Sequence, residues 1–135
     1  MKHLIITLAS AVILTASAMA QKIGVSLAYF DDRFLVDVRE AMVETAKKLG
    51  ADIQFEDAQG DIGKQLSQIQ NFAAQKVGAI IVNPVDTMAT PNMTKLATDA
   101  GIPLVYVNRK PAEGNAAQGG RLRWFRRERV GQARR

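Results

Sequence analysis

The chain has 135 residues, which is enough for one domain of ordinary size and too few for two full lobes. Hydrophobic residues make up 47% of it, charged residues 23%, and Cys is absent, so a disordered chain, a disulfide framework, a zinc-thiolate site and a cysteine nucleophile are excluded. The formal net charge of +5 comes from the end of the chain, because residues 115–135 hold seven Arg against one Glu, whereas residues 21–114 hold ten Lys and Arg against twelve Asp and Glu.

The first 20 residues are typical of a cleavable signal peptide. A short positive start precedes an apolar run over residues 4–16, which is shorter than the roughly 20 residues of a membrane-spanning helix. Ala18 and Ala20 are the small residues at −3 and −1, so we expect cleavage after Ala20 and export to a bacterial periplasm. An exported fold without Cys depends on packing alone.

The segment that follows changes from a strand pattern to a helix pattern. Residues 22–28 form a short apolar run without helical spacing, as in a strand that is buried on both faces. Apolar residues three, four and seven apart then predict a helix over residues 34–49. We expect Asp31 or Asp32 to cap its start and Gly50 to end it.

The same alternation continues along the chain. Residues 53–56 predict a second strand, residues 62–77 a second helix that Gly78 ends, and residues 79–82 a third strand. Strands and helices that alternate in this way form right-handed βαβ units.

One more unit completes the pattern. Apolar residues between 93 and 100 predict a third helix, with Pro91 in its first turn and Thr90 as a possible cap, and residues 102–107 predict a fourth strand. The fold class is therefore α/β, a doubly wound parallel sheet with helices on both faces.

In such a fold a ligand binds beyond the carboxyl ends of the strands, near the switch in strand order. The segments that follow the predicted strands are rich in polar and aromatic side chains: residues 29–34, 56–58, 83–86 and 108–110. Carboxylates, an aromatic ring, an amide and a guanidinium suit a polyhydroxylated ligand such as a sugar or a cyclitol. The first segment contains no Gly, which argues against a phosphate-binding loop, so no cofactor is expected.

Five motifs occur in an order that resembles the N-terminal lobe of the periplasmic sugar-binding proteins of ABC transporters, the type I periplasmic binding proteins. They are KIGVSLAYFDDRFL, KKLGA, FEDAQGDIGKQLSQIQNF, AIIVNPVDT and AGIPLVYVNRKP. The resemblance covers residues 1–114 and is closest to the rhizopine- and inositol-binding branch, because FEDA with KQLSQ, VNPVDT and VYVNR occur together. It implies a monomeric solute-binding protein that binds a cyclitol or monosaccharide and docks on a membrane permease.

The resemblance also implies which residues contact the ligand: Asp32, Phe34, Asn83, Asn108 and Arg109. Phe34 would stack on the ring, and the others would form hydrogen bonds with hydroxyls. Each has a second interpretation, since Phe34 begins an apolar helix stripe, Asp32 is a candidate cap, and Asn83 precedes a proline as in many turns.

The chain departs from the ribose-binding members of the family at two positions. Leu35 stands where they often have a second aromatic residue, and Asn108 stands where they often have Asp. Both differences argue against ribose as the ligand.

No catalytic residues and no metal site are predicted, because the carboxylates have no nucleophile, metal cluster or His to act with. Asp57 and Asp86 are interpreted as caps or loop residues. Two other functions remain open: the effector domain of a sugar-responsive repressor, and a receiver or flavodoxin-like protein. The repressor would begin with a helix-turn-helix, and the signal peptide argues against both.

Residues 115–135, here called the Arg-rich tail, have no Lys, no Ile and no lasting strand or helix period. A basic arm with Trp124 and Phe125 that binds RNA is one interpretation, although we expect no nucleic acid as partner of an exported protein, and a disordered terminus is another. A third interpretation is a frameshift. Codons for residues 116–134 can be chosen so that translation one base forward gives LPKVVAYVGSDESVSAKL. This text has the strand, turn and helix start with which a member of the family would continue after its fourth strand. We expect this third case, with a signal peptide over 1–20, a lobe over 21–114, and a truncated chain that binds its ligand weakly or not at all.

Overall fold

The computed structural model describes residues 21–112 and 123–125, so the predicted signal peptide and most of the Arg-rich tail lie outside the described residues. The elements follow in the order β1 (Lys22–Leu27), α1 (Arg33–Leu49), β2 (Asp52–Asp57), α2 (Ile62–Ala74), β3 (Ala79–Val82), the 3₁₀ turn η1 (Thr87–Ala89), α3 (Thr90–Asp99), β4 (Leu104–Val107) and β5 (Arg123–Phe125). The four strands and three helices that the apolar patterns predict are all present.

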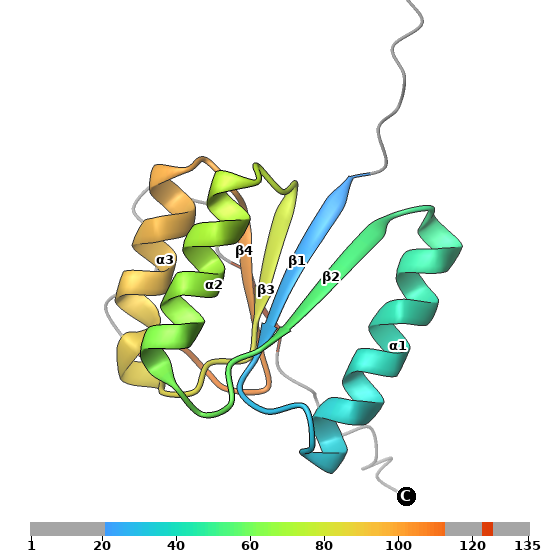
Figure 1. The fold of residues 1–135 in the computed structure, drawn as a ribbon, viewed down its shortest axis with the longest axis horizontal. Helices are drawn as coiled ribbons and strands as arrows, with labels where there is room; N and C mark the ends of the chain where they lie inside the picture. The colour runs from blue at the N-terminus through green and yellow to red at the C-terminus, as the bar shows by residue number, and fades with distance from the viewer. Residues whose placement is uncertain (1–20, 113–122, 126–135) are drawn as a thin grey trace, which may run out of the picture.

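The strands form one parallel sheet in the order β2-β1-β3-β4-β5. Figure 1 labels the first four of them. The chain passes from β1 outward to β2 and then returns across β1 to β3, so the strand order switches between β1 and β3. All the carboxyl ends lie at the same edge of the sheet, where open α/β sheets bind their ligands. We refer to it as the carboxyl edge.

Helices cover both faces of the sheet, with α1 on one side and α2 and α3 on the other (Figure 1). The core under α1 is built on Val25, Leu27 and Leu35. A larger core lies under α2 and α3, and its buried members are Ile69, Phe72, Val77, Ile80, Val82, Met93, Ala97, Ile102, Leu104 and Tyr106. The doubly wound α/β fold is confirmed.

The side chains of β1 alternate between these two cores. Val25 and Leu27 pack under α1, while Gly24 and Ser26 face α2. A Cβ atom on Gly24 would lie 2.5 Å from Cγ of Phe72, closer than real Cβ contacts come. The strand therefore needs a glycine where the Phe72 ring rests on its backbone.

The ends of α1 agree with the sequence prediction. The Asp32 carboxylate accepts a hydrogen bond from the main-chain nitrogen of Leu35 at 3.1 Å, as an N-cap does. Gly50 adopts a left-handed conformation with φ of 64° and donates to the main-chain oxygens of Ala46 and Lys47.

Two helix boundaries differ from the prediction. α2 ends at Ala74, and the chain turns through Lys76 with φ of 53°, so Gly78 does not end the helix. Val77 is buried beyond the helix end, which explains why it extended the apolar stripe.

The N-cap of α3 is Ala89, whereas the sequence suggests Thr90. Thr90 is the first helical residue, and its hydroxyl donates to the Thr87 oxygen at 2.6 Å.

The Arg-rich tail contributes a strand that its sequence pattern does not predict. β5 (Arg123–Phe125) pairs in parallel with β4, from Val105 opposite Arg123 to Val107 opposite Phe125. Main-chain groups make these hydrogen bonds, so an open sheet edge accepts a strand without regard to its side-chain pattern. Residues 123–125 therefore form a strand although the tail has no lasting strand period.

Candidate functional site

All five predicted ligand-binding residues lie at the carboxyl edge. Asp32 and Phe34 follow β1, Asn83 follows β3, and Asn108 and Arg109 follow β4. Because β1, β3 and β4 are neighbours in the sheet, these three segments lie next to the switch in strand order.

Asn83 ties the ends of three strands together. Its main-chain nitrogen donates to the Ser26 oxygen at 2.9 Å, which extends the pairing of β3 with β1. Its side-chain Nδ2 donates to the Val107 oxygen of β4 at 3.2 Å. Since Val107 offers an acceptor, the amide must turn Nδ2 toward it and Oδ1 away.

The other side-chain atom of Asn83 has no partner. Its residue is fully buried, and among residues 21–112 Oδ1 is the one buried side-chain nitrogen or oxygen without a hydrogen bond. Most buried acceptors are paired, because an unpaired one costs about 1–3 kcal/mol. The Asn83 oxygen is therefore an enclosed acceptor directly beneath the carboxyl edge, with its hydrogen-bonding capacity unused.

Arg109 holds the loop that follows β3. Its Nη1 donates to the main-chain oxygens of Pro84 at 3.0 Å and Val85 at 2.7 Å. The residue is exposed, so solvent can hydrate the rest of its guanidinium. Asn108, directly before it, is exposed and has φ of 66°, a left-handed conformation that Asn tolerates better than most residues. The structure thus brings Asn83 and Arg109 to the same short loop.

Asp32 and Phe34 lie at the start of α1. The Asp32 carboxylate is exposed and uses one oxygen as the N-cap, which leaves other lone pairs for a ligand. Phe34 is 38% exposed and belongs to neither core, whereas the next residue, Leu35, is 2% exposed and packs under α1. Of these two neighbours Leu35 is therefore the buried one, and the Phe34 ring is accessible.

Sequence reasoning missed a buried polar network behind this edge. The Ser26 hydroxyl donates to Oε1 of Gln68 at 2.7 Å and accepts from Nε2 of Gln65 at 3.1 Å. Both glutamines lie on the face of α2 that carries Ile69 and Phe72, and both are buried. The sequence does contain a signal for this network, since the two Gln stand at helix positions that are otherwise apolar. Amides at buried positions need hydrogen-bond partners, so the spacing alone could have predicted a buried polar network.

Tyr106 supports α3 from β4. Its hydroxyl donates to the Thr90 oxygen at 2.9 Å and lies 3.0 Å from the Thr94 hydroxyl. Burial raises the pKa of Tyr106 to about 12, against a smaller opposite effect of the bond with Thr94. The phenol is neutral at physiological pH and has a packing role.

Asp86 and Asp57 accept hydrogen bonds from nearby main-chain nitrogens. Asp86 caps η1 through the Met88 nitrogen at 2.8 Å, and Asp57 accepts from the Gln59 nitrogen at 2.9 Å, as the loop interpretation predicts. Within the described parts of the chain, no group of three or more His, Cys, Asp or Glu is placed to hold a metal ion. None of the helices described there is long and apolar enough to cross a membrane.

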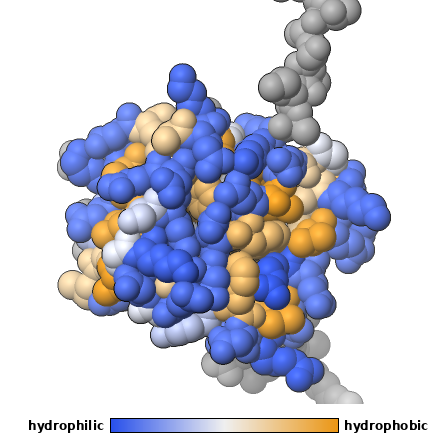
Figure 2. Space-filling model, viewed as in Figure 1, coloured by the Kyte–Doolittle hydropathy of each residue, from blue (hydrophilic) through white to orange (hydrophobic). Residues whose placement is uncertain are grey.

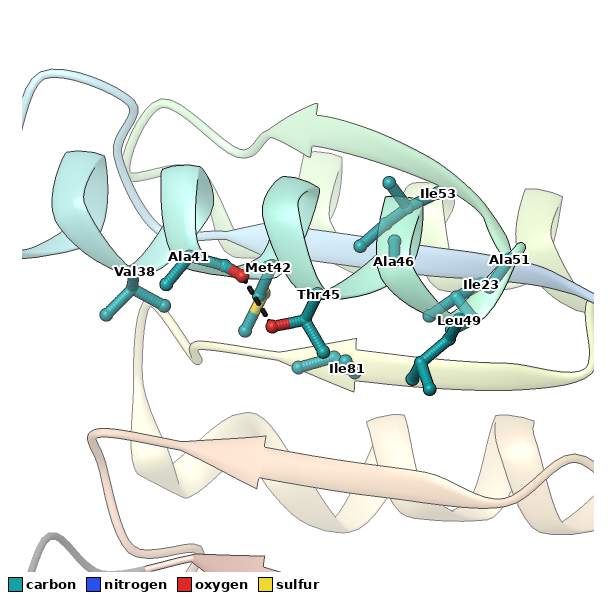
Figure 3. Close-up of a pocket in the computed structure, with 10 residues that line it drawn as sticks. All are labelled: Ile23, Val38, Ala41, Met42, Thr45, Ala46, Leu49, Ala51, Ile53 and Ile81. Atoms are coloured by element: carbon teal, nitrogen blue, oxygen red, sulfur yellow. Dashed lines mark hydrogen bonds between the residues drawn. The ribbon is translucent and has the colours of Figure 1, made fainter.

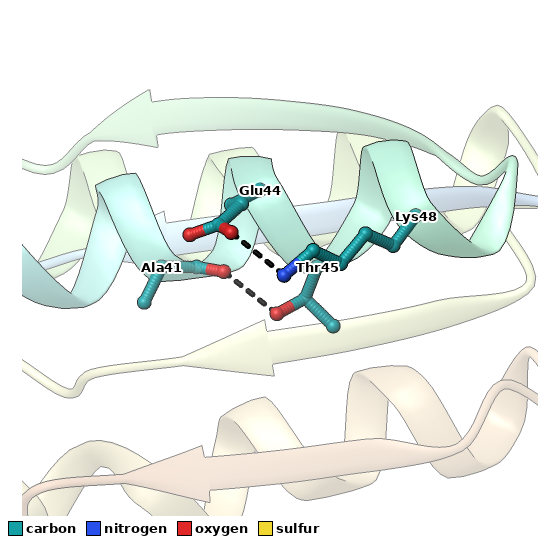
Figure 4. Close-up of polar contacts among 4 residues, drawn as sticks. All are labelled: Ala41, Glu44, Thr45 and Lys48. Atoms are coloured by element: carbon teal, nitrogen blue, oxygen red, sulfur yellow. Dashed lines mark hydrogen bonds and ion pairs between the residues drawn. The ribbon is translucent and has the colours of Figure 1, made fainter.

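An apolar groove of about 330 Å³ lies between α1 and the sheet, away from the residues just described. Most of the visible surface is hydrophilic, and apolar residues gather over the strands between α2 and α1 (Figure 2). Figure 3 shows the groove's lining, which includes Met42, Leu49 and Ile53 and no charged side chain. The Thr45 hydroxyl there already donates to the Ala41 oxygen at 2.8 Å, beside the exposed Glu44–Lys48 ion pair (Figure 4). The groove is not suited to a polyol.

Comparison with known proteins gives consistent matches. The family model of the periplasmic binding protein domain matches residues 23–120. A putative rhizopine-binding protein of Rhizobium meliloti is 58% identical over 112 residues, which are 82% of this chain and 36% of that protein. A ribose import binding protein of Bacillus subtilis is 32% identical over 68% of this chain and 30% of its own length. The chain thus spans about a third of the length of these curated relatives.

Solved structures agree with these matches. The Caulobacter myo-inositol binding protein, bound to myo-inositol, superposes with a TM-score of 0.69 and 30% identity over 77% of this chain and 35% of that one. An ABC transporter solute binding protein of Bacillus halodurans C-125 with bound myo-inositol gives 0.65 and 39% over 72% of this chain and 34% of its own. From the family match over residues 23–120 and these relatives, the chain belongs to the periplasmic binding protein family and has the fold of its type I N-terminal lobe.

Proposed function

We propose that the protein is the solute-binding component of an ABC importer and that it recognises a cyclitol or monosaccharide resembling inositol or rhizopine. The observation that carries this proposal is the 58% identity with a putative rhizopine-binding protein over 82% of the chain. Two structures in complex with myo-inositol, at 39% and 30% identity, support the cyclitol class.

The chemistry of the carboxyl edge supports a polyol. A hydroxyl both donates and accepts, so it needs acceptors and donors side by side. Asp32 and Oδ1 of Asn83 supply acceptors, and the guanidinium of Arg109 supplies donors beyond the Nη1 that holds the loop. The accessible ring of Phe34 offers the flat apolar face against which a sugar or cyclitol ring stacks.

The start of α1 favours a cyclitol over ribose. Leu35, at the position where ribose binders often have a second aromatic, is 2% exposed and belongs to the core under α1. It is not available for stacking, so Phe34 acts without that partner. Asn108 supplies an amide in place of a carboxylate.

We further propose that the protein acts in the periplasm as a monomer, after cleavage of residues 1–20, and delivers its ligand to a membrane permease. It performs no catalysis and uses no cofactor, metal or nucleic acid. The family match and the named relatives, which are binding proteins, support this role.

The Arg-rich tail, in the same proposal, is read out of frame, so the chain carries the contacts of one lobe. The family match ends at residue 120, inside the tail, and the tail's composition differs from that of residues 21–114. Each hydrogen bond that a second lobe would add contributes about 1 kcal/mol, so its loss weakens binding. We propose dissociation constants in the millimolar range for the chain as it stands.

The test is saturation-transfer NMR, observed on the ligand, with the full chain and equal concentrations of myo-inositol and ribose. The proposal predicts transfer to myo-inositol and much less to ribose, with loss of transfer in Asn83→Leu. Equal transfer to both ligands contradicts the specificity. Micromolar binding in calorimetry contradicts the weak, one-lobe site.

A further inference from the structure

A single buried side chain holds the loop that carries Asn83. Gln65 is fully buried on α2, and its Nε2 donates to the Asn83 main-chain oxygen at 3.0 Å. Its Oε1 accepts from the Val85 main-chain nitrogen at 2.9 Å. One amide therefore binds a carbonyl and an N–H on either side of Pro84, as the backbone of a neighbouring strand would. Pro84 has no N–H of its own to pair.

The same loop is also held by Arg109. Its Nη1 donates to the oxygens of Pro84 and Val85, so all three carbonyls of residues 83–85 accept a side-chain hydrogen bond. The two clamps differ in their surroundings, because Gln65 is buried and Arg109 is exposed. A buried hydrogen bond is not replaced by water, whereas an exposed one is. The conformation of the loop thus depends on Gln65 more than on Arg109.

We propose that Gln65 is a positioning residue for ligand binding: it fixes the main chain of residues 83–85, and with it the place of the Asn83 amide and of the Arg109 guanidinium that this loop holds. This inference rests on the proposed function, since it takes Asn83 and Arg109 as ligand contacts. It adds a residue that would not touch the ligand, and it predicts that affinity nevertheless depends on this side chain.

The chain offers a matched control in Gln68. This residue lies one turn along α2, is 6% exposed and contacts the same Ser26 hydroxyl. Its Nε2 donates to the Asp57 oxygen at the end of β2, at 2.9 Å, and not to the loop after β3. A purely structural role predicts similar effects for the two glutamines, whereas the positioning role predicts a difference between them.

The experiment compares Gln65→Met with Gln68→Met in the full, ¹⁵N-labelled chain. Amide exchange measures whether the Val85 N–H is protected, and titration with myo-inositol, followed by shifts of the protein signals, measures affinity. We expect both variants to lower stability. We expect Gln65→Met alone to lose the protection of the Val85 N–H. We also expect it to weaken myo-inositol binding by about tenfold or more, because it removes the two neutral hydrogen bonds that Gln65 forms with the loop.

A third variant tests the same point within one protein. Gln65→Glu has a donor and an acceptor while its carboxyl is protonated, and only acceptors once it is ionised. Burial raises the pKa of such a carboxyl. Myo-inositol affinity of this variant should fall as pH rises through that pKa, while wild-type affinity stays constant over about pH 5–8. A rescue at low pH would not arise from a general loss of packing.

The outcomes separate the two claims. No shift of any wild-type signal with myo-inositol overturns the proposed function and this inference with it. Wild-type binding that Gln65→Met and Gln68→Met weaken equally overturns the positioning role and leaves the proposed function standing. Selective weakening in Gln65→Met, or affinity of Gln65→Glu that returns at low pH, supports both.

Discussion

Nδ2 of Asn83 donates to the main-chain oxygen of Val107 at 3.2 Å, so a side chain joins β3 to β4 beyond the last pair of their ladder, Val82 with Tyr106. The same residue leaves its Oδ1 buried and unpartnered. One amide therefore joins two strands with its nitrogen, while its oxygen forms no hydrogen bond.

Replacement of Asn83 by Asp should separate these two uses. A carboxylate has no hydrogen to give Val107, and it places a buried charge against that oxygen. We expect a loss of about 2–4 kcal/mol in the free energy of unfolding at pH 7, measured in urea. Asn92→Asp, at an exposed position of α3, is the control and should change stability by about 0.5 kcal/mol or less. Equal losses in the two variants would contradict the role of the Val107 bond.

Gly24→Ala should destabilise the sheet, because the new Cβ atom would lie 2.5 Å from Cγ of Phe72. Overpacking of this kind costs about 1–3 kcal/mol. Chemical denaturation measures the loss. The double variant Gly24→Ala with Phe72→Leu should show less than the sum of the two single losses, since the smaller side chain removes the clash. Strict additivity would mean that the two groups do not meet.

Tyr106 should affect stability only in alkali. Burial raises its pKa from 10.0 to about 12, so the folded chain retains a proton that the unfolded chain releases. This contribution is complete below about pH 10 and is lost as pH rises toward 12. We expect the free energy of unfolding to fall over that interval, and to fall less in Tyr106→Phe, as followed by denaturation at fixed pH values. An identical alkaline decline in both proteins would refute the assignment.

The coding DNA should continue in the next reading frame. The frameshift hypothesis predicts that resequencing across codons 110–140, translated one base forward, gives an apolar strand, a Ser-Asp-Glu turn and then a second α/β lobe. A stop codon that closes that frame at once, with the Arg-rich tail found in the protein by mass spectrometry, would show that the tail is genuine. In that case β5 becomes a native part of the sheet.

Cleavage of the predicted signal peptide has its own test. The protein recovered from the periplasm should begin at Gln21, as determined by N-terminal sequencing. Ala20→Pro should leave the precursor uncut, because signal peptidase needs a small residue at −1. A secreted form that keeps Met1 would contradict the prediction.

Much of the fold follows from local patterns in the sequence. Buried strands such as Ala79–Val82 are continuous apolar runs, and α1 has an apolar stripe between a capping Asp32 and Gly50. Local patterns do not predict features that depend on residues far away in the chain, such as the end of α2. Val77 reads as helix because it is buried, yet its burial is against the core beyond the end of α2.

The sequence predicts where the candidate site lies in the fold, but it does not predict which hydrogen bonds its side chains form. Parallel strands bring their carboxyl ends to one edge, which places Asn83 and Arg109 together from the strand order alone. The side chain of Arg109, however, lies on the carbonyls of Pro84 and Val85, and such a contact across 24 or 25 residues has no local signal. The buried amide of Gln65 was overlooked for the same reason, since its partners lie 18 to 39 residues away.

According to the proposed function, the carboxyl edge around Asn83 and Arg109 binds a cyclitol. The most direct measurement is a titration of the ¹⁵N-labelled chain with myo-inositol, in which the side-chain amide of Asn83 is compared with that of the exposed Asn92. Cyclitol binding at this edge predicts saturable shifts of the Asn83 side chain, Asn108 and Arg109 in the millimolar range, with Asn92 unchanged. Shifts confined to the apolar groove between α1 and the sheet, or none at a saturating concentration, would contradict it.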